Sequence, residues 1–122
     1  MARILIAEDD DAIRGLLVRA LSADGHELTA AADGAAALDV LQRQHGRFDL
    51  LLADVKLPAM DGIALALATG RAHPDIAIML MTGYADQRER AHDLDALVHE
   101  VITKPFSVAQ IRGAVKEALL RR

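Results

Sequence analysis

One short apolar run constrains the fold of this sequence more than any other feature. The run lies within residues 48–62 and ends on a single acid, Asp54, after which Pro58 and Gly62 turn the chain. An apolar run of this length between turn signals predicts a strand that is buried on both faces. Asp54 would then lie at the carboxyl end of that strand, where open α/β sheets bind ligands. Taken alone, the stretch supports two hypotheses equally: Asp54 is a reactive acid, or it is a loop acid that caps the next turn.

Four further apolar runs extend the same pattern through the chain. The expected strands cover Arg3–Ala7 and residues 26–31, 48–54, 76–81 and 101–102. Residues at helical spacing follow each strand, at 13–21, 36–41, 63–71, 85–92 (a short, marginal helix) and from Ser107 onward. A strand followed by a helix, five times over, predicts an α/β fold with a doubly wound (βα)5 five-stranded parallel sheet of flavodoxin-like architecture. We expect residues 1–122 to form a single domain with no output domain.

The composition argues against several classes of function. The chain has no cysteine, so disulfides, thiolate metal sites and thiol catalysis are excluded. One tyrosine and two phenylalanines leave little material for stacking on bases or on a flavin, and the net charge of −4 argues against nucleic-acid binding. No apolar run approaches the ~18 residues of a membrane span, and no signal peptide is evident. We therefore expect a cytoplasmic protein without nucleic-acid or membrane partners.

Four of the five expected strands end in residues that carry chemistry: Glu8-Asp9, Asp54, Thr82 and Lys104. In a parallel sheet the carboxyl ends of all strands lie at one edge, so the fold would bring these residues together. Crowded carboxylates repel one another unless a cation lies among them, and their hard oxygens suit Mg²⁺. A carboxylate beside Mg²⁺ is a nucleophile for a phosphoryl group, whose oxygens Lys104 and the Thr82 hydroxyl would bind. The expected product is an aspartyl phosphate on Asp54.

The same residues, in the same order along the whole chain, resemble the receiver domain of two-component response regulators. The matching features are Glu8-Asp9, Asp54 with the loop at 58–62, Thr82-Gly83 and Lys104-Pro105-Phe106. The resemblance implies a phosphoprotein of phosphorelay signal transduction, in which Asp54 accepts a phosphoryl group from a histidine kinase or a histidine phosphotransfer protein. It implies no separate enzymatic activity, because such a domain promotes only its own phosphorylation and dephosphorylation.

The resemblance also assigns roles to the residues around Asp54. It implies that Mg²⁺ is bound by Asp9, Asp54 and the backbone carbonyl of Lys56, with Glu8 in the outer sphere. Two further residues would bind the phosphoryl group, Thr82 and Lys104. The bond between Lys104 and Pro105 would be cis, as it is in the family.

Within the family, the Ala-Glu-Asp-Asp-Asp opening and the Met-Thr-Gly-Tyr-Ala stretch are similar to CpdR-like single-domain response regulators. This similarity implies a regulator that acts by phosphorylation-controlled protein–protein binding, one form of which is an adaptor role in regulated proteolysis. The downstream partner would bind the face formed by helix 4, strand 5 and helix 5. Residues 86–100, in this region, are poorly patterned for a stable helix, which fits a segment that rearranges; a solvated charged face is the alternative. A monomer or a weak dimer is expected.

Departures from the family pattern leave the switching mechanism open. In the family, Thr82 is coupled to an aromatic residue three positions before Lys104, and that position holds Val101 here. We hypothesise that Tyr84 carries part of the conformational signal; a partly buried loop ring is the equally supported alternative. The side chain of Lys56 either affects the attack of water on the aspartyl phosphate or only faces solvent.

Two other functions fit the sequence less well. A Mg²⁺-dependent phosphohydrolase with an aspartyl-phosphate intermediate generally has a second acid two residues after its nucleophile, and Lys56 occupies that position. A flavodoxin-like cofactor binder would need Ser, Thr and Gly in the first strand-to-helix loop, which holds four acids at 8–11 instead. Because acids repel phosphate unless a cation intervenes, we predict a phosphorylation-controlled binding module and keep the phosphohydrolase as the alternative.

Overall fold

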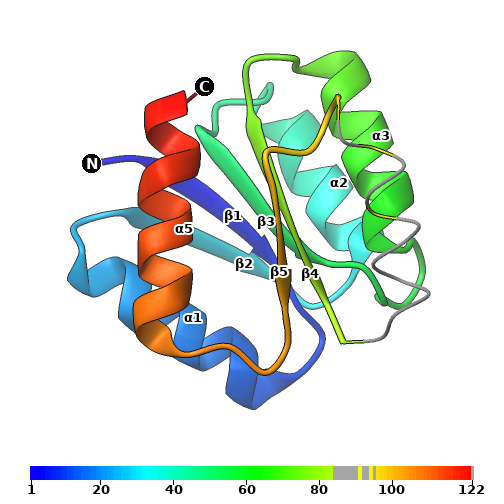
Figure 1. Ribbon diagram of the computed structural model, residues 1–122. Helices are drawn as coiled ribbons and strands as arrows, with labels where there is room; N and C mark the ends of the chain where they lie inside the picture. The colour runs from blue at the N-terminus through cyan, green and yellow to red at the C-terminus, as the bar shows by residue number, and fades with distance from the viewer. Residues whose placement is uncertain (84–90, 92–93, 95, 122) are drawn as a thin grey trace.

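The computed structural model describes residues 1–83, 91, 94 and 96–121, which form one parallel sheet with helices on both faces (Figure 1). The strand order is β2-β1-β3-β4-β5, and all four pairings are parallel. The strands are β1 (Arg3–Ala7), β2 (Glu27–Ala31), β3 (Leu50–Asp54), β4 (Ala77–Thr82) and β5 (Glu100–Thr103). The described helices are α1 (Asp11–Ala23), α2 (Gly34–Arg43), α3 (Gly62–Ala72) and α5 (Val108–Arg121). The predicted fold class is therefore confirmed.

The core consists of two hydrophobic clusters, one on each face of the sheet. Alternate residues of β3 enter opposite clusters: Leu51 and Ala53 lie with residues of α2 and α3, whereas Leu50 and Leu52 lie with residues of α1 and α5. Figure 1 shows the same division of the helices between the two faces. Every residue of β3 and β4 is buried, which confirms the prediction of strands covered on both sides.

The second helix begins earlier than the predicted 36–41. Asp33 caps it by accepting a hydrogen bond from the Ala36 amide at 2.6 Å, so the helix starts at Gly34. Gly34 is required by a close approach, because a β-carbon there would lie 1.8 Å from the carbonyl oxygen of Met60. The loop that follows β3 can therefore lie against α2, where the Gly34 amide donates to the Pro58 carbonyl at 3.3 Å.

Two of the sequence-based hypotheses concern residues that the structure leaves undescribed. Tyr84 and most of residues 86–100 lie outside the described residues, so the hypotheses about them stay open. The described residues of that segment include Ala91 and Val98, which are buried in the cluster on the α2 and α3 face. Among the described parts of the chain, no helix has both the length and the apolar character needed to span a membrane.

Candidate functional site

The carboxyl ends of β1, β3, β4 and β5 meet at one edge of the sheet, as the strand order requires. Backbone hydrogen bonds hold the ends in register. The Val55 amide donates to the Met81 carbonyl at 2.9 Å, and the Lys104 amide donates to the Thr82 carbonyl at 2.7 Å. These bonds continue the parallel ladders just past the strands, so side chains at the strand ends are held on rigid elements.

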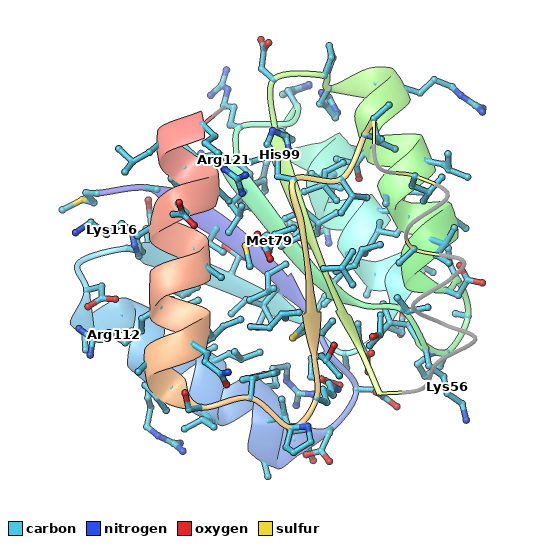
Figure 2. The ribbon with its side chains drawn as sticks, viewed as in Figure 1. Lys56, Met79, His99, Arg112, Lys116 and Arg121 are labelled. Carbon is cyan, nitrogen blue, oxygen red and sulfur yellow. The ribbon has the colours of Figure 1, made fainter. Side chains whose placement is uncertain are left out.

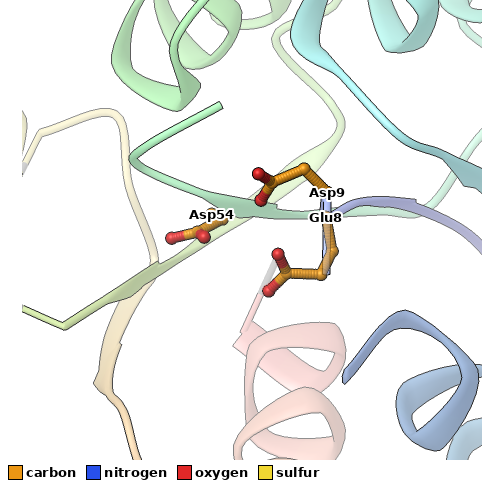
Figure 3. Close-up of side chains that lie close together, drawn as sticks. All are labelled: Glu8, Asp9 and Asp54. Carbon is orange, nitrogen blue, oxygen red and sulfur yellow. The ribbon is translucent and has the colours of Figure 1, made fainter. Parts of the chain in front are cut away.

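Three acids lie together at this edge: Glu8, Asp9 and Asp54 (Figure 3). Each offers a carboxylate oxygen, and these oxygens all lie within 4.8 Å of one another. Glu8 is fully buried and Asp54 is 7% exposed, so water screens their charges poorly. Their mutual repulsion favours a bound cation, and three hard oxygen donors suit Mg²⁺. The predicted convergence of these acids is thus present in the structure.

Lys104 supplies the positive charge that the described residues place among these acids. Its Nζ donates to Glu8 Oε1 at 2.6 Å and to Asp54 Oδ2 at 3.0 Å. Burial favours the neutral amine, but the hydrogen bonds to Glu8 and Asp54 outweigh it and raise the pKa of Lys104. Burial raises the pKa of Glu8, although the hydrogen bond from Lys104 opposes this. Lys104 therefore stays charged and links the first-strand acid to Asp54.

Thr82, the last residue of β4, presents an unusual hydroxyl. The residue is fully buried, and its Oγ1 has no hydrogen-bond partner among the described residues. Buried side-chain oxygens are nearly always hydrogen-bonded in native proteins, so an unpartnered one calls for an explanation. At the edge that carries Asp54 and Lys104, the described residues thus leave this hydroxyl with a hydrogen bond still to be made.

The loop between β1 and α1 fixes the first-strand acids. Asp10 caps α1 by accepting from the Ile13 amide at 3.0 Å, and its own amide donates to Glu8 Oε2 at 3.1 Å. Arg14 Nη1 donates to the backbone carbonyl of Glu8 at 2.9 Å and also pairs with Asp11. This role of Arg14 was not predicted from the sequence. The spacing of Asp11 and Arg14 on one helix face was the available signal, but it does not reveal the contact with a carbonyl.

The loop between β3 and α3 is built close to the backbone of Asp54. A β-carbon on Gly62 would lie 2.0 Å from the Asp54 carbonyl oxygen, and the Gly62 amide donates to the Val55 carbonyl at 2.8 Å. Asp61 caps α3 by accepting from the Ala64 amide at 2.8 Å. Asp61 therefore has a structural role here, while Asp54 is the acid of this stretch that faces the site.

Lys56 lies in the same loop, with an exposed side chain that points outward (Figure 2). It contributes to the lining of the cavity beside the acids. The expectation that its backbone carbonyl binds a metal stays a prediction.

The cavity over the acids has a volume of about 830 Å³ and is only partly polar. Its apolar lining comes from the start of α1 and from the segment after Lys104, chiefly Ile13, Leu16 and Phe106. Sequence patterns predicted the acids but missed this apolar wall. The site can therefore take a charged group at its floor while apolar residues contact the molecule that carries it.

The two remaining predictions concern the strand that ends near Lys104. Val101 is half-buried in β5, where it is paired with Leu80 rather than with Thr82, and it packs against the core on the α2 and α3 face. Its proposed part in switching stays a hypothesis. The bond between Lys104 and Pro105 is cis, as the resemblance implied.

Comparison with known proteins agrees with this arrangement. The model of the response regulator receiver domain matches residues 4–116. The chain belongs to the response regulator receiver domain family. It is 37% identical to the response regulator receiver protein CpdR of Brucella abortus, over 98% of both chains. The expected resemblance to single-domain receivers of the CpdR kind is thus confirmed.

Longer relatives and solved structures give the same result. The chain is 39% identical to the sensor kinase CckA of Brucella abortus over 97% of its own length, but it spans only 12% of that kinase. A CheY-like receiver domain protein of Methanospirillum hungatei superimposes with a TM-score of 0.89 at 30% identity, covering 99% and 95% of the two chains. The response regulator TrrA of Thermotoga maritima, solved in complex with Mg²⁺-BeF, gives a TM-score of 0.83 at 30% identity, covering 97% and 99%.

Proposed function

We propose that Asp54 accepts a phosphoryl group and that this receiver controls a protein–protein interaction through that modification. One observation carries the proposal: the Asp54 carboxylate lies within 4.8 Å of two other acids and 3.0 Å from Lys104 Nζ. A carboxylate so placed has room for a cation on one side and a fixed positive charge on the other, which is the environment of a nucleophile for phosphoryl transfer. Membership of the receiver family supports the same conclusion.

The transfer follows from the chemistry of the side chains. An oxygen of the ionised Asp54 carboxylate attacks the phosphorus of a phosphohistidine on the donor protein. The bond between phosphorus and the imidazole nitrogen breaks, and the imidazole leaves. No proton has to be removed from the nucleophile. Lys104 and the Thr82 hydroxyl, which has no partner among the described residues, then bind oxygens of the aspartyl phosphate, which is the product.

The donor set at the sheet edge fits Mg²⁺. Asp9, Asp54 and the backbone carbonyl of Lys56 would hold it. When bound, Mg²⁺ would offset the negative charge that collects on the carboxylates and on the phosphoryl oxygens. Glu8 is already paired with Lys104, so an outer-sphere role through water suits it better than direct binding. The similar response regulator TrrA was solved in complex with Mg²⁺-BeF, which supports the binding of Mg²⁺ by this receiver.

The direct test is incubation with acetyl phosphate and Mg²⁺, followed by intact mass spectrometry. We expect one added phosphoryl group in the wild type and none in Asp54→Ala. Asp61→Asn is the matched control, because asparagine keeps the capping oxygen that the Ala64 amide needs. The control is expected to be modified like the wild type.

Two results would contradict the assignment. A phosphoryl group that persists in Asp54→Ala would move the acceptor to another residue. No modification of folded wild-type protein, by acetyl phosphate or by a phosphorylated histidine phosphotransfer protein, would show that the site does not accept phosphoryl groups.

The physiological donor in this proposal is a histidine kinase or a histidine phosphotransfer protein. The output face is formed by the helix-4 region, β5 and α5, and an adaptor role in regulated proteolysis is one form that its binding would take. Addition of Mg²⁺ and beryllofluoride, which mimics the phosphoryl group, is expected to shift amide NMR signals of β5 and α5 as well as those near Asp54. Shifts confined to the loops that carry the acids would argue against this output face.

A further inference from the structure

A second groove lies between α5 and the segment that joins α1 to β2, away from the acids. It has a volume of about 610 Å³ and shares no lining residue with the cavity over Asp54. Its lining is, in chain order, Asp24, His26, Ala109, Arg112, Gly113, Lys116, Leu119 and Leu120. Two of these positions are small residues on α5, Ala109 and Gly113, which leave the floor of the groove open.

The charge of the groove is opposite to that of the whole chain. Arg112 and Lys116 are one helical turn apart and project from the same side of α5 (Figure 2). Among the described lining residues, Asp24 is the one acid, and Arg112 is paired with it. Arg112 Nε donates to Asp24 Oδ2 at 2.9 Å and to Oδ1 at 3.1 Å, and Arg112 Nη2 also donates to Oδ1. Hydrogen bonds from Arg112 lower the pKa of Asp24, and the charges of Arg112, His26 and Lys116 act in the same direction. Because Arg112 is paired with Asp24, the charge of Lys116 makes the groove net positive, whereas the whole chain carries a net charge of −4.

The groove also exposes apolar surface at one end. Leu120 is 76% exposed, a large fraction for a leucine on a helix that is otherwise packed on the sheet. Gly113 lies in the middle of α5, where glycine disfavours a helix, and a β-carbon there would meet no atom within 4 Å. The lack of any contact over Gly113 means that the α5 backbone is open to close approach by another chain.

We propose that this groove binds an acidic peptide segment of a partner protein, with a carboxylate against Lys116 and an apolar side chain against Leu120 and Gly113. The charge complementarity selects this occupant. An anionic bilayer is a weaker candidate, because two cations contribute only about 1 kcal/mol each to the free energy of binding to it. The net charge of −4 also opposes such binding. Nucleic acids need several cations to neutralise successive phosphates, and the groove provides two.

This docking site goes beyond the proposed phosphorylation-controlled interaction. None of its lining residues contacts Asp54, and the groove opens toward the α1–β2 segment, whereas the proposed output face includes the side of α5 toward β5. We therefore expect the groove to bind its partner in either phosphorylation state. It would hold a partner continuously, while the face that responds to Asp54 makes the regulated contact.

The test is selection of short random peptides displayed on phage against the folded full chain, followed by calorimetric titration of synthetic copies. We expect the enriched peptides to carry several Asp or Glu residues around one large apolar residue. Lys116→Glu and Gly113→Leu are each expected to weaken their binding at least about tenfold, a loss typical of a residue at the centre of an interface. Mg²⁺ with beryllofluoride is expected to change the affinity less than about twofold.

The variants separate lost binding from lost folding. Gly113→Leu adds a side chain to open space and replaces glycine in a helix, so its melting temperature is expected to equal or exceed that of the wild type. The matched controls are Ala64→Leu and Arg71→Glu, which change exposed positions of α3 outside the groove in the same way. Both controls should bind the selected peptides as the wild type does.

Several outcomes would overturn the inference. One is that no peptide is enriched, and another is that the enriched peptides show no acidic bias. A third is that neither Lys116→Glu nor Gly113→Leu weakens the binding of the enriched peptides. Two further outcomes would assign the groove to another occupant and so reject an acidic peptide: Lys116-dependent binding to phosphatidylglycerol vesicles without peptide binding, or self-association in sedimentation experiments that Gly113→Leu abolishes.

Discussion

The two edges of the sheet hold their polar side chains in opposite ways. At the amino edge, polar groups are paired within the protein: the Arg3 amide donates to Asp49 Oδ2 at 2.8 Å, and the Ile78 amide donates to His99 Nδ1 at 3.2 Å. At the carboxyl edge, three acids lie together and two of them, Glu8 and Asp54, share Lys104, while the Thr82 hydroxyl has no partner among the described residues. The amino-edge groups named here are satisfied within the protein, whereas the carboxyl edge keeps charges and a donor that the described residues leave without partners.

The difference shows where this fold gives up stability for function. Like charges gathered with little water raise the free energy of the folded state unless a cation joins them. The amino edge carries no such cost, because each hydrogen bond there replaces one that the unfolded chain makes with water. Substitutions at the two edges should therefore change the free energy of unfolding by different amounts, and these changes should respond differently to metal and pH.

The largest expected effect is that of Lys104→Ala in metal-free protein. It removes the charged partner of Glu8, which is fully buried, and leaves the three acids without a compensating charge among the described residues. We expect the free energy of unfolding to fall by about 3 kcal/mol, measured by urea denaturation with EDTA present.

Arg43→Ala is the control for that measurement, because it breaks an exposed pair with Asp39 and should cost less than about 0.5 kcal/mol. Adding Glu8→Gln to Lys104→Ala should restore part of the loss by removing the uncompensated charge. A loss of less than about 1 kcal/mol in Lys104→Ala would contradict the view that the carboxyl edge depends on this lysine.

A smaller effect, with a defined pH dependence, is expected from His99→Ala at the amino edge. The ring of His99 accepts a hydrogen bond only when Nδ1 is unprotonated, and the substitution leaves the Ile78 amide unpaired, at a cost of about 1 kcal/mol. Burial, and then the charge of Arg121, lower the pKa of His99. Arg121 Nη2 also donates to the His99 carbonyl at 3.2 Å, and the two labelled side chains lie close together in Figure 2.

The sign of the pH effect follows from this shift. The unfolded chain protonates His99 near its ordinary pKa of about 6.5, whereas the folded chain resists protonation to a lower pH. The stabilisation that neutral His99 contributes is therefore complete above about pH 6.5 and is lost as the pH falls through the folded-state pKa of His99. Denaturation of wild type and His99→Ala at several pH values should show the difference shrinking on acidification. His45→Asn, at an exposed loop position, should follow the wild type; a constant difference would reject the mechanism.

A gain in stability is expected from Ala59→Gly in the loop after β3. Ala59 has φ 67°, a left-handed conformation that costs an alanine about 1–2 kcal/mol. Glycine relieves that strain but adds freedom to the unfolded chain, so the net gain should be about 0.5–1 kcal/mol in the unfolding free energy. At the amino edge, His45 has φ 55°, and His45→Gly should gain less because histidine adopts this conformation more readily. Destabilisation by Ala59→Gly would show that strain does not accumulate beside the site.

The smallest effect is expected from Lys56→Ala. If Lys56 contributes its backbone carbonyl to the metal site, the Mg²⁺ affinity should stay within about twofold of the wild-type value in a titration followed by thermal shift. Asp9→Asn, which removes a carboxylate from the same site, should weaken the affinity strongly and serves as the positive control. The decay rate of the phosphorylated variant separately decides whether the Lys56 side chain affects the attack of water on the phosphate.

Much of the fold was predictable because its signals are local. The run that ends on Asp54 predicted a doubly buried strand, and β3 is one, although it begins at Leu50. The strand expected at 101–102 extends over Glu100–Thr103, because pairing with β4 adds residues whose polar character hides them from an apolar pattern. The start of α2 was predicted too late, because the glycine after Asp33 is needed for a contact with Met60.

The convergence of the site was predictable from topology, but its pairings were not. Parallel strands place Glu8, Asp54 and Lys104 at one edge whatever their side chains do. Which acid Lys104 contacts depends on the packing of residues 96 and 50 positions away in the chain, and no local pattern contains that information. The contact of Arg112 with Asp24, 88 positions apart, was missed for the same reason.

The sequence by itself therefore determined the order of strands and helices and the residue at the end of each strand, because apolar periodicity and turn residues act over a few positions. It singled out Asp54 as a strand-end acid with other acids nearby. Only the tertiary structure decided that Glu8 and Asp54 share Lys104, that the Thr82 hydroxyl lacks a partner among the described residues, and that a cationic groove opens beside α5. Those features arise where side chains far apart in the chain meet in a desolvated space, and there distance and burial set the energy of each contact.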